Sequence, residues 1–283
     1  MALKAHKVNR SLGGTITLFL FLGILGIFMM VPLLFVTVNA FKPLNELFIF
    51  PPKLYVIHPT FNNFRQLFQI MNGAWMPFSR YLFNTLMITT VGTAGHIIVA
   101  SLCAYSLSKL TFPGSKAIFR VIVLSLMFTP AVTTVPTYII MAKIGLVDSL
   151  WAIILPALQS SLGLYLMKQF LDTGPDSLLE AGRIDGTNEL YLFVRIVMPV
   201  IRPAWLTLSI LSIQGLWNTV SPYTYSEHLK TVPQALSQIV SAGIARSGVG
   251  SAVALLIILV PIVCFVISQA SIIQTMSTSG MKG

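Results

Sequence analysis

The chain has 283 residues, of which 55% are hydrophobic and only 9% are charged. A soluble globular protein carries roughly 25% charged residues, so this composition excludes that class and indicates an integral membrane protein surrounded mainly by lipid. The net charge is +10, but the basic residues lie between apolar stretches and form no Lys/Arg-rich run. This distribution is typical of orientation in a membrane and gives no support for a nucleic-acid partner.

Six apolar stretches are long enough to cross a membrane as helices, which takes about 17–25 residues. In chain order they are residues 15–38, 81–106, 121–142, 150–167, 204–220 and 252–274. The sequence therefore predicts an all-α integral membrane protein with one domain over residues 15–275 and short tails at 1–14 and 276–283. The first stretch is too long for the core of a signal peptide, and no small-x-small cleavage site follows it, so we expect it to remain as a span.

The basic residues of the loops set the orientation of a membrane protein, because they accumulate on the cytoplasmic side. With six spans, eleven of the 18 Lys and Arg residues fall on the side of the two termini and seven on the other. We therefore expect both termini in the cytoplasm, together with the loop at residues 168–203. On the opposite side, residues 39–80 contain five prolines, which argue against one continuous helix.

The loop at 168–203 is rich in charge, in a chain that otherwise avoids charge. Ser177 and Glu180 fit a capping box, which predicts that a helix begins there. Asp185-Gly186 is a turn signal, and positive φ is expected at the glycine. Thr187 or Asn188 can then cap a second helix. Both helices are expected to lie across the cytoplasmic face of the membrane.

The second of these helices carries an amphipathic pattern, and Pro199 is expected to end it. Its apolar residues follow at i, i+3, i+4 and i+7: Leu190, Phe193, Val194 and Val197. An alternative is that the loop rests on lipid headgroups. Against this, Ala181 and Gly182 provide a small-residue surface that another backbone can approach, and acidic residues lie among the basic ones, which disfavours anionic lipid.

This segment resembles the signature of the permease subunits of ABC importers, which is called the EAA loop. The family pattern is Glu-Ala-Ala, three residues, Gly, nine residues, Ile, one residue and Leu-Pro. The matching residues here are Glu180-Ala181-Gly182, Gly186, Ile196 and Met198-Pro199. Two positions depart conservatively from the pattern, Gly182 and Met198.

Further stretches resemble the maltose-type carbohydrate branch of this family over nearly the whole chain. They are residues 41–43, 50–53, 59–63, 80–85, 104–114 and 215–218. Thr219 stands where the family usually has an acidic residue. The tail at 279–283 is similar to that of the G-type subunit of the branch.

The resemblance implies a permease subunit of an ATP-driven sugar or oligosaccharide importer in the bacterial cytoplasmic membrane. The implied partners are a second homologous permease, two copies of an ABC ATPase and an extracytoplasmic solute-binding protein. ATP and Mg are expected on the ATPase, because this chain lacks a Gly-x-x-x-x-Gly-Lys-Ser/Thr loop. No catalytic residue, metal or cofactor is expected in this chain. Contact with the ATPase is expected at Glu180, Ala181, Gly182, Arg183, Asp185, Gly186, Ile196 and Pro199.

A sugar path needs neutral hydrogen-bonding groups and aromatic faces. Candidates in or near the fourth and fifth stretches are Gln159, Gln214, Trp217, Asn218 and Tyr223. For each of these the alternative is hydrogen bonding between helices, which is common in membranes. His96 is the one titratable group inside the stretches, either as a packing residue or as part of a proton relay. Prolines within the stretches either act as gates or shape the helices.

Other functions remain as alternatives. The same machinery can import another solute, such as glycerol phosphate. A secondary transporter driven by an ion gradient needs charged groups at mid-membrane, whereas all eight acidic residues lie outside the six stretches. A membrane enzyme would require a His/carboxylate cluster or a His-Glu-x-x-His pair, and the stretches contain neither.

Overall fold

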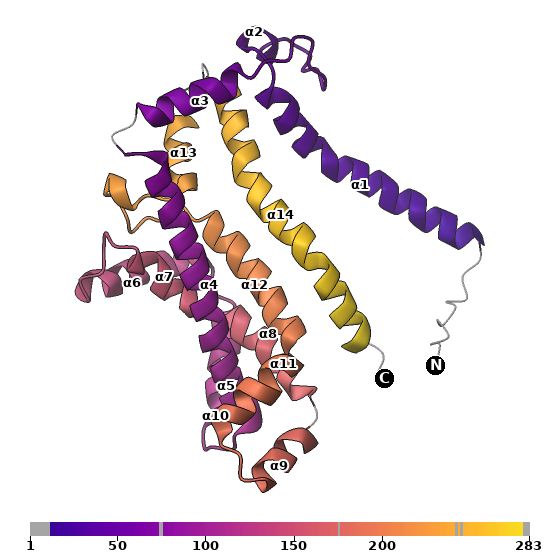
Figure 1. Cartoon of the computed structure of the whole chain (residues 1–283), viewed down its shortest axis with the longest axis vertical. Coiled ribbons are helices and arrows are strands. Elements are labelled where there is room, and N and C mark those ends of the chain that lie inside the picture. Colours follow the sequence, from indigo (N-terminus) through magenta and orange to yellow (C-terminus); the bar gives the residue numbers. More distant parts are fainter. Residues whose placement is uncertain (1–11, 74–75, 175, 241–242, 244–245, 280–283) are drawn as a thin grey trace. The chain divides into compact units, whose positions relative to one another are not determined.

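The structure, a computed structural model, describes residues 12–73, 76–174, 176–240, 243 and 246–279. All regular secondary structure in these residues is helical (Figure 1). The chain divides into two compact units, Met1–Ile70 with Ala242–Leu255, and Met71–Ser241 with Leu256–Gly283. Each unit has its own set of contacts.

The first unit contains α1 (Leu12–Ala40), α2 (Leu44–Leu47), most of α3 (Asn62–Asn72) and the beginning of α14 (Ser247–Ser279). Buried polar side chains hold the segment between α1 and α3. The carboxylate of Glu46 accepts hydrogen bonds from the backbone N–H groups of Ile57 (3.1 Å) and His58 (2.9 Å). The amide of Asn63 donates to the carbonyls of Ala40 (2.9 Å) and Lys42 (2.8 Å). These bonds satisfy backbone groups of a proline-rich segment that forms few turns of helix.

The second unit contains the remaining helices. In chain order they are α4 (Phe78–Lys109), α5 (Ser115–Ser125), α6 (Pro130–Lys143), α7 (Trp151–Leu158), α8 (Ser161–Asp172), α9 (Ser177–Ile184), α10 (Glu189–Leu192), the π-helix η1 (Phe193–Val197), α11 (Met198–Val200), α12 (Arg202–Trp217), the 3-10 helix η2 (Glu227–Leu229) and α13 (Val232–Val240), with α14 from Leu256.

Three helices are long and apolar enough to cross a membrane: α1, α4 and the part of α14 over Ser247–Ile267. They contain the expected stretches 15–38 and 81–106 and most of 252–274. A fourth candidate combines Glu189–Val200 with Arg202–Trp217, which are bent by 78° at Ile201. This pair includes most of the expected stretch 204–220.

Two expected stretches, both of which contain proline, are not single helices. The stretch 121–142 is divided between α5 and α6, because Pro130 lacks an N–H and holds Thr129 in an extended conformation (φ −78°, ψ 153°). The stretch 150–167 is divided between α7 and α8. There Gln159 leaves the helical region, and the Ser160 hydroxyl caps α8 by accepting from the N–H of Gly163.

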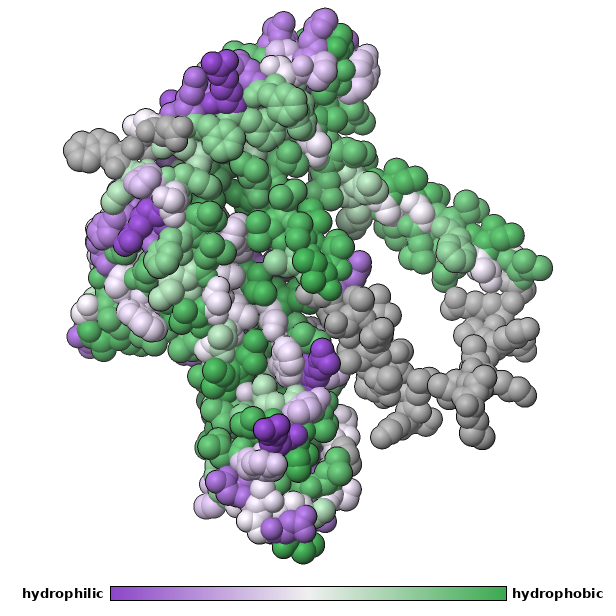
Figure 2. All heavy atoms as spheres, in the orientation of Figure 1, coloured by the Kyte–Doolittle hydropathy of each residue, from purple (hydrophilic) through white to green (hydrophobic). Residues whose placement is uncertain are grey.

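Helix α4 is the central helix of the second unit and packs against α7, α8 and α12. Small residues allow the close approach that membrane helices require. A Cβ at Gly92 would lie 2.7 Å from Leu216 of α12, and a Cβ at Gly95 would lie 2.6 Å from Leu158 of α7. Figure 2 shows mainly hydrophobic side chains over the long helices, with hydrophilic ones gathered over α2 and α3 and around α9 and α10, beyond the helix ends. This pattern matches helices that face lipid and a polar end that leaves it.

At the opposite end of α4, its first turns hold the loop that follows α12. The amide of Asn84 donates to the carbonyls of His228 (2.8 Å) and Lys230 (3.0 Å). At the next residue, the Thr85 hydroxyl accepts a hydrogen bond of 2.8 Å from the N–H of Val232. The Tyr81 hydroxyl donates to Glu227 at 2.8 Å. The Arg80–Thr85 part of the sequence therefore anchors a loop more than a hundred residues away in the chain.

Asp148 holds the same loop from its other side. Its carboxylate accepts from the hydroxyl of Ser226 and from the N–H groups of Ser226 (2.9 Å) and Tyr225 (3.0 Å). These hydrogen bonds, the one from the Ser226 hydroxyl first, lower the pKa of Asp148 below its ordinary value. The interaction thus contributes at neutral pH and is lost as the pH falls through the lowered pKa.

The Asn84 contacts generate a prediction about stability. Asn84→Leu leaves two loop carbonyls without their donor, so we expect a loss of roughly 1–3 kcal/mol in the free energy of unfolding. Thr89→Val is the control on the same helix, because the buried Thr89 hydroxyl has no hydrogen-bond partner among the described residues. The measurement is thermal unfolding of both variants in detergent. An equal shift for Asn84→Leu and Thr89→Val would contradict the anchoring role.

Candidate functional site

Helix α9 begins at Ser177, where the sequence predicts, but without the predicted cap. The capping box of Ser177 and Glu180 does not form, so that expectation was wrong. Asp176 occupies the cap position and makes no side-chain cap bond. Its carboxylate is instead bound to the ammonium group of Lys109 at 2.6 Å. An ion pair to α4, which is remote in sequence, therefore lies at the beginning of α9 in place of the capping box.

The end of α9 depends on Gly186. This residue has φ +74°, which confirms the expected positive φ. Its N–H donates to the carbonyl of Arg183 (3.1 Å), and the N–H of Thr187 donates to the carbonyl of Gly182 (3.1 Å). This pair of bonds is a Schellman motif, which satisfies two carbonyls at the end of the helix.

Asn188, rather than Thr187, caps the next helix. Its side-chain oxygen accepts from the N–H groups of Leu190 (2.7 Å) and Tyr191 (3.1 Å). Both were open alternatives from the sequence, and the structure selects Asn188.

The helix after Asn188 differs from the expected pattern in its register and its end. Phe193 and Val197 are buried as expected, but Leu190 and Val194 are exposed and Leu192 is fully buried. The buried face therefore includes Leu192 beside Phe193, and the π-helix η1 (Phe193–Val197) keeps Val197 on it, because its wider turn places residues four apart close to one line. Pro199 does not end the helix, which continues to Val200. In the wider turn the N–H of Met198 donates to the carbonyl of Phe193. In a regular α-helix the ring of Pro199 would clash with the carbonyl four residues before it.

Gly182 packs closely against side chains of the same chain. A Cβ at this position would lie 2.4 Å from Leu192 and 3.6 Å from Ile196. The sequence predicted the approach of another backbone, whereas the group that lies against Gly182 is the Leu192 side chain of the same chain. Ile196 is half-buried in this contact, whereas Pro199 is exposed.

The opposite face of α9 is open. The exposed residues there are Glu180, Ala181, Arg183, Ile184, Asp185 and Gly186. Ile184 has 86% of its surface exposed, although it is apolar and flanked by charges. Sequence reasoning missed this residue, and its signal was a single apolar side chain between Arg183 and Asp185.

The last turns of α4 fasten this segment at two points. At the first, the buried hydroxyl of Tyr105 donates to the carboxylate of Glu189. The same carboxylate accepts from the guanidinium of Arg183 at 2.7 Å. The ring of Tyr105 also packs on Phe193, with 5.6 Å between ring centroids. Helix α4 is thereby connected to α9, α10 and η1 through one tyrosine.

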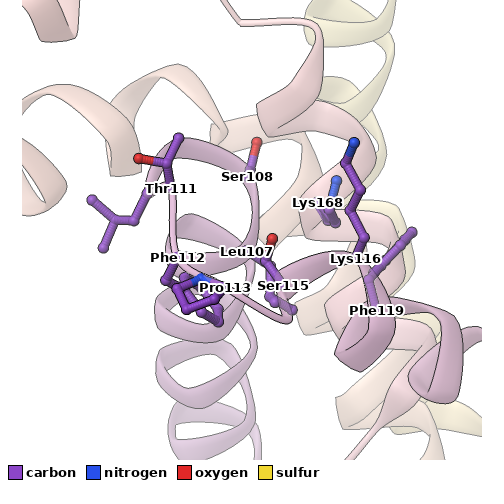
Figure 3. Close-up of a pocket in the computed structure, with 10 residues that line it drawn as sticks. Leu107, Ser108, Thr111, Phe112, Pro113, Ser115, Lys116, Phe119 and Lys168 are labelled. Atoms are coloured by element: carbon purple, nitrogen blue, oxygen red, sulfur yellow. The ribbon is translucent and has the colours of Figure 1, made fainter.

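The second point lies one turn further along α4. The ammonium group of Lys109 binds Asp176 and the carbonyl of Gly174 (3.3 Å). The hydroxyl of Ser108 donates to Asp172 at 2.6 Å, and Lys168 binds the other oxygen of that carboxylate at 2.6 Å. Burial of Asp172 opposes its ionisation, but these hydrogen bonds outweigh burial and lower its pKa. Figure 3 shows Ser108 and Lys168 beside the end of α4.

We call these contacts of Tyr105, Ser108 and Lys109 the α4 clamp. They fix the segment from Asp172 to Phe193 to the end of a membrane-crossing helix. Sequence reasoning did not identify them as site residues. The available signal was the placement of Tyr105 and Lys109 on one helical face, at i and i+4, beside a charged loop.

The five residues expected on the sugar path do not come together. Gln214 and Asn218 are exposed on α12 and line a groove of about 340 Å³ with residues of α14, including Pro261. Tyr223 lines a different cavity, of about 520 Å³, between α4, α7, α8 and α12. Gln159 is exposed at the break between α7 and α8. Trp217 is 5% exposed and donates to the carbonyl of Ile257 at 3.1 Å, so its ring face is not open.

His96 lines the cavity that contains Tyr223. One ring nitrogen, Nδ1, contacts the hydroxyl of Ser212. The other, Nε2, is against Gly163, where a Cβ would lie 2.3 Å away. No carboxylate contacts this histidine among the described residues. The geometry supports the packing role for His96 over the proton relay. Within the same residues, no group of three or more His, Cys, Asp or Glu side chains is placed to hold a metal ion.

Comparison with known proteins agrees with these features. Residues 96–278 match the family of the binding-protein-dependent transport system inner membrane component. The chain is 34% identical over 150 residues to the polygalacturonan/rhamnogalacturonan transport system permease protein YtcP of Bacillus subtilis (strain 168), which is 50% of this chain and 52% of that protein. It is 23% identical over 274 residues to the galactooligosaccharides transport system permease protein GanQ of the same organism, which is 94% of each protein. The match to YtcP thus spans about half of that relative's length.

The fold also has a solved counterpart. One chain in the crystal structure of a bacterial ABC transporter involved in the import of the acidic polysaccharide alginate superposes with a TM-score of 0.78. The match covers 92% of this chain and 98% of that chain, at 20% sequence identity. At this identity the likeness shows the fold alone. Because the family match covers well over half of its length, the chain belongs to the binding-protein-dependent transport family, as a multi-pass membrane subunit of a transporter and not an enzyme.

Proposed function

We propose that this chain is one of two permease subunits of an ATP-driven importer for a sugar or an oligosaccharide. The observation that supports this most directly is the α4 clamp, which connects an exposed helix at one end of the unit to a membrane-crossing helix. Family membership and the oligosaccharide relatives named above support the substrate class.

In this proposal α9 is the contact to the ATPase. It presents Ile184 as an apolar anchor, with Glu180, Arg183 and Asp185 around it as a charged rim, which is the usual anatomy of a protein interface. When the two ATPase copies close on ATP and Mg, α9 moves with them. The α4 clamp transmits this movement to α4, and α4 transmits it to α7, α8 and α12. The chain itself binds no nucleotide in this scheme.

We further propose six spans with both termini in the cytoplasm. The helices α1, α4, α12 and α14 would be four of the spans, and the pairs α5–α6 and α7–α8 would be two broken spans. Non-helical backbone at membrane depth is tolerated where protein or water surrounds it, so the breaks at Thr129 and Gln159 are expected to face a sister permease or the transport path. The loop anchored by Asn84 and Asp148 would then lie outside, on the side of the solute-binding protein.

The exposed polar groups of α12 suggest where the solute passes. Gln214 and Asn218 lie one turn apart on a helix that is otherwise mostly apolar. Beside them Gly215 leaves open space, with no atom within 4 Å of a Cβ at that position. Among the residues that the structure describes, none that lines the groove beside Gln214 or the cavity beside Tyr223 carries a charge. Neutral linings favour a sugar over the alternative of glycerol phosphate, which would require cationic groups.

The function is tested by uptake into vesicles containing the chain with its sister permease, ATPase and binding protein. We expect ATP-dependent accumulation of neutral oligosaccharides that requires the binding protein and continues in the presence of an uncoupler. A panel of mono- and oligosaccharides, with glycerol phosphate as comparison, identifies the substrate class. Accumulation that an uncoupler abolishes while ATP is present would show an ion-driven transporter instead.

The role of α9 is tested at Gly186. Gly186→Val forces a β-branched residue to φ +74°, at a cost of roughly 1–3 kcal/mol, and a Cβ there meets no atom within 4 Å, so the effect is backbone strain alone. We expect insertion and pairing with the sister permease to persist, while ATPase retention or sugar uptake per ATP falls.

The matched control is Gly145→Val. Gly145 has φ +71° and equally open surroundings, but it lies between α6 and α7, away from α9. We expect this variant to retain the ATPase and to remain coupled. The measurements are co-purification of the ATPase and uptake for both variants. If Gly186→Val retains the ATPase and transports at the parental rate, α9 is not the coupling element.

A further inference from the structure

A groove beside the end of α4 has no part in the transport path or the ATPase contact proposed above. It has a volume of about 590 Å³ and lies between the end of α4, the loop that leads to α5, the first turns of α5 and Lys168 of α8. Figure 3 shows the ammonium groups of Lys116 and Lys168 extending to the same side of this groove.

The groove carries an excess of positive charge. Lys168 is held in place, with 14% of its side chain exposed and its Nζ 4.6 Å from the centroid of the Phe119 ring. Asp172 compensates the charge of Lys168, at 2.6 Å. Lys116 has no ion-pair partner among the described residues. Two ammonium groups against one carboxylate leave one positive charge available for an anion.

The other walls of the groove combine hydroxyls with apolar surface. Ser115 contributes a hydroxyl group that can donate to an anionic oxygen, and Leu107, Phe112 and Phe119 contribute apolar surface. A lining of this kind suits a ligand with an anionic group attached to an apolar body. A small free anion would use only the polar part of it.

The position of the groove points to the same kind of ligand. Helix α4 is apolar enough to cross a membrane and ends at Lys109, so the groove lies at the depth where a span meets the headgroup region. From there α5 continues with three exposed apolar residues on its surface: Ile118 (48%), Val121 (65%) and Leu124 (52%). This apolar strip begins at the groove and runs along α5.

We propose that the groove binds the phosphate group of an anionic phospholipid. Lys116 and Lys168 bind the phosphate oxygens, the hydroxyl of Ser115 donates to them, and an acyl chain lies on the apolar strip of α5. The site is independent of the transported solute. Lys168 also binds Asp172, the carboxylate to which the Ser108 hydroxyl of the α4 clamp donates.

The test is photo-crosslinking in vesicles that contain the complete complex, with p-benzoylphenylalanine placed at Phe112. We expect crosslinking to phosphatidylglycerol when it is mixed into phosphatidylcholine. Each nearby basic residue is worth about fivefold in binding to an anionic lipid, the equivalent of ~1 kcal/mol. Lys116→Gln should therefore weaken the crosslink about fivefold, and Lys168→Gln should do the same.

Arg120→Gln is the matched control, because Arg120 is exposed on α5 and carries the same charge without lining the groove. An equal loss in Arg120→Gln would show diffuse attraction to the membrane and overturn the site. Crosslinking to the ATPase in place of lipid would also overturn it. So would complete competition by soluble glycerol phosphate, since that result assigns the groove to a free phosphate ester. Sugar uptake is not part of this readout, so failure here leaves the proposed function untouched.

Discussion

The contact of the Tyr105 hydroxyl with the carboxylate of Glu189 is the interaction on which the second unit most depends. Apolar packing alone would otherwise hold the segment after α8, through Leu179, Leu192 and Phe193 in a buried cluster with α4 and α8. With the Tyr105 contact, and with the ion pair of Lys109 and Asp176, the segment becomes part of the same rigid body as α4. Because Tyr105 is buried and its partner also binds Arg183, breaking the contact leaves a charged network partly unsatisfied.

The packing of α4 extends this constraint along the whole unit. Gly92, Gly95 and Gly163 allow the neighbouring helices to approach so closely that a larger residue would force one of them to shift. At the other end, Asn84 and Thr85 hold the loop after α12 by buried hydrogen bonds. A displacement of α9 is therefore coupled by direct contacts to a loop at the far end of α4. Such packed, hydrogen-bonded elements transmit movement because they have few alternative arrangements.

The sequence predicted the features that depend on local rules. Composition and hydropathy identified the long apolar helices, and turn chemistry identified the positive φ of Gly186 and the cap at Asn188 as one of two choices. The failures depend on contacts between distant residues. The capping box at Ser177 does not form, and the preceding residue, Asp176, binds Lys109 instead. The neighbour of Gly182 is Leu192, which only the folded loop brings close. The amphipathic pattern assumed a regular α-helix, whereas Phe193–Val197 is a π-helix and Leu192 is buried in place of Leu190 and Val194. The sugar-path candidates are divided because α12 and the loop after it line different cavities.

The central claim is that α9 moves with α4, and a distance measurement tests it most directly. Spin labels at the exposed native Cys103 of α4 and at Ala181→Cys of α9, with Cys264→Ser, report the separation of the two helices in the complete complex. The account predicts a narrow distance distribution that is the same without nucleotide and with ATP, and that broadens in Tyr105→Phe. A separation that changes by several ångströms on addition of ATP, or a distribution indifferent to Tyr105→Phe, would contradict it.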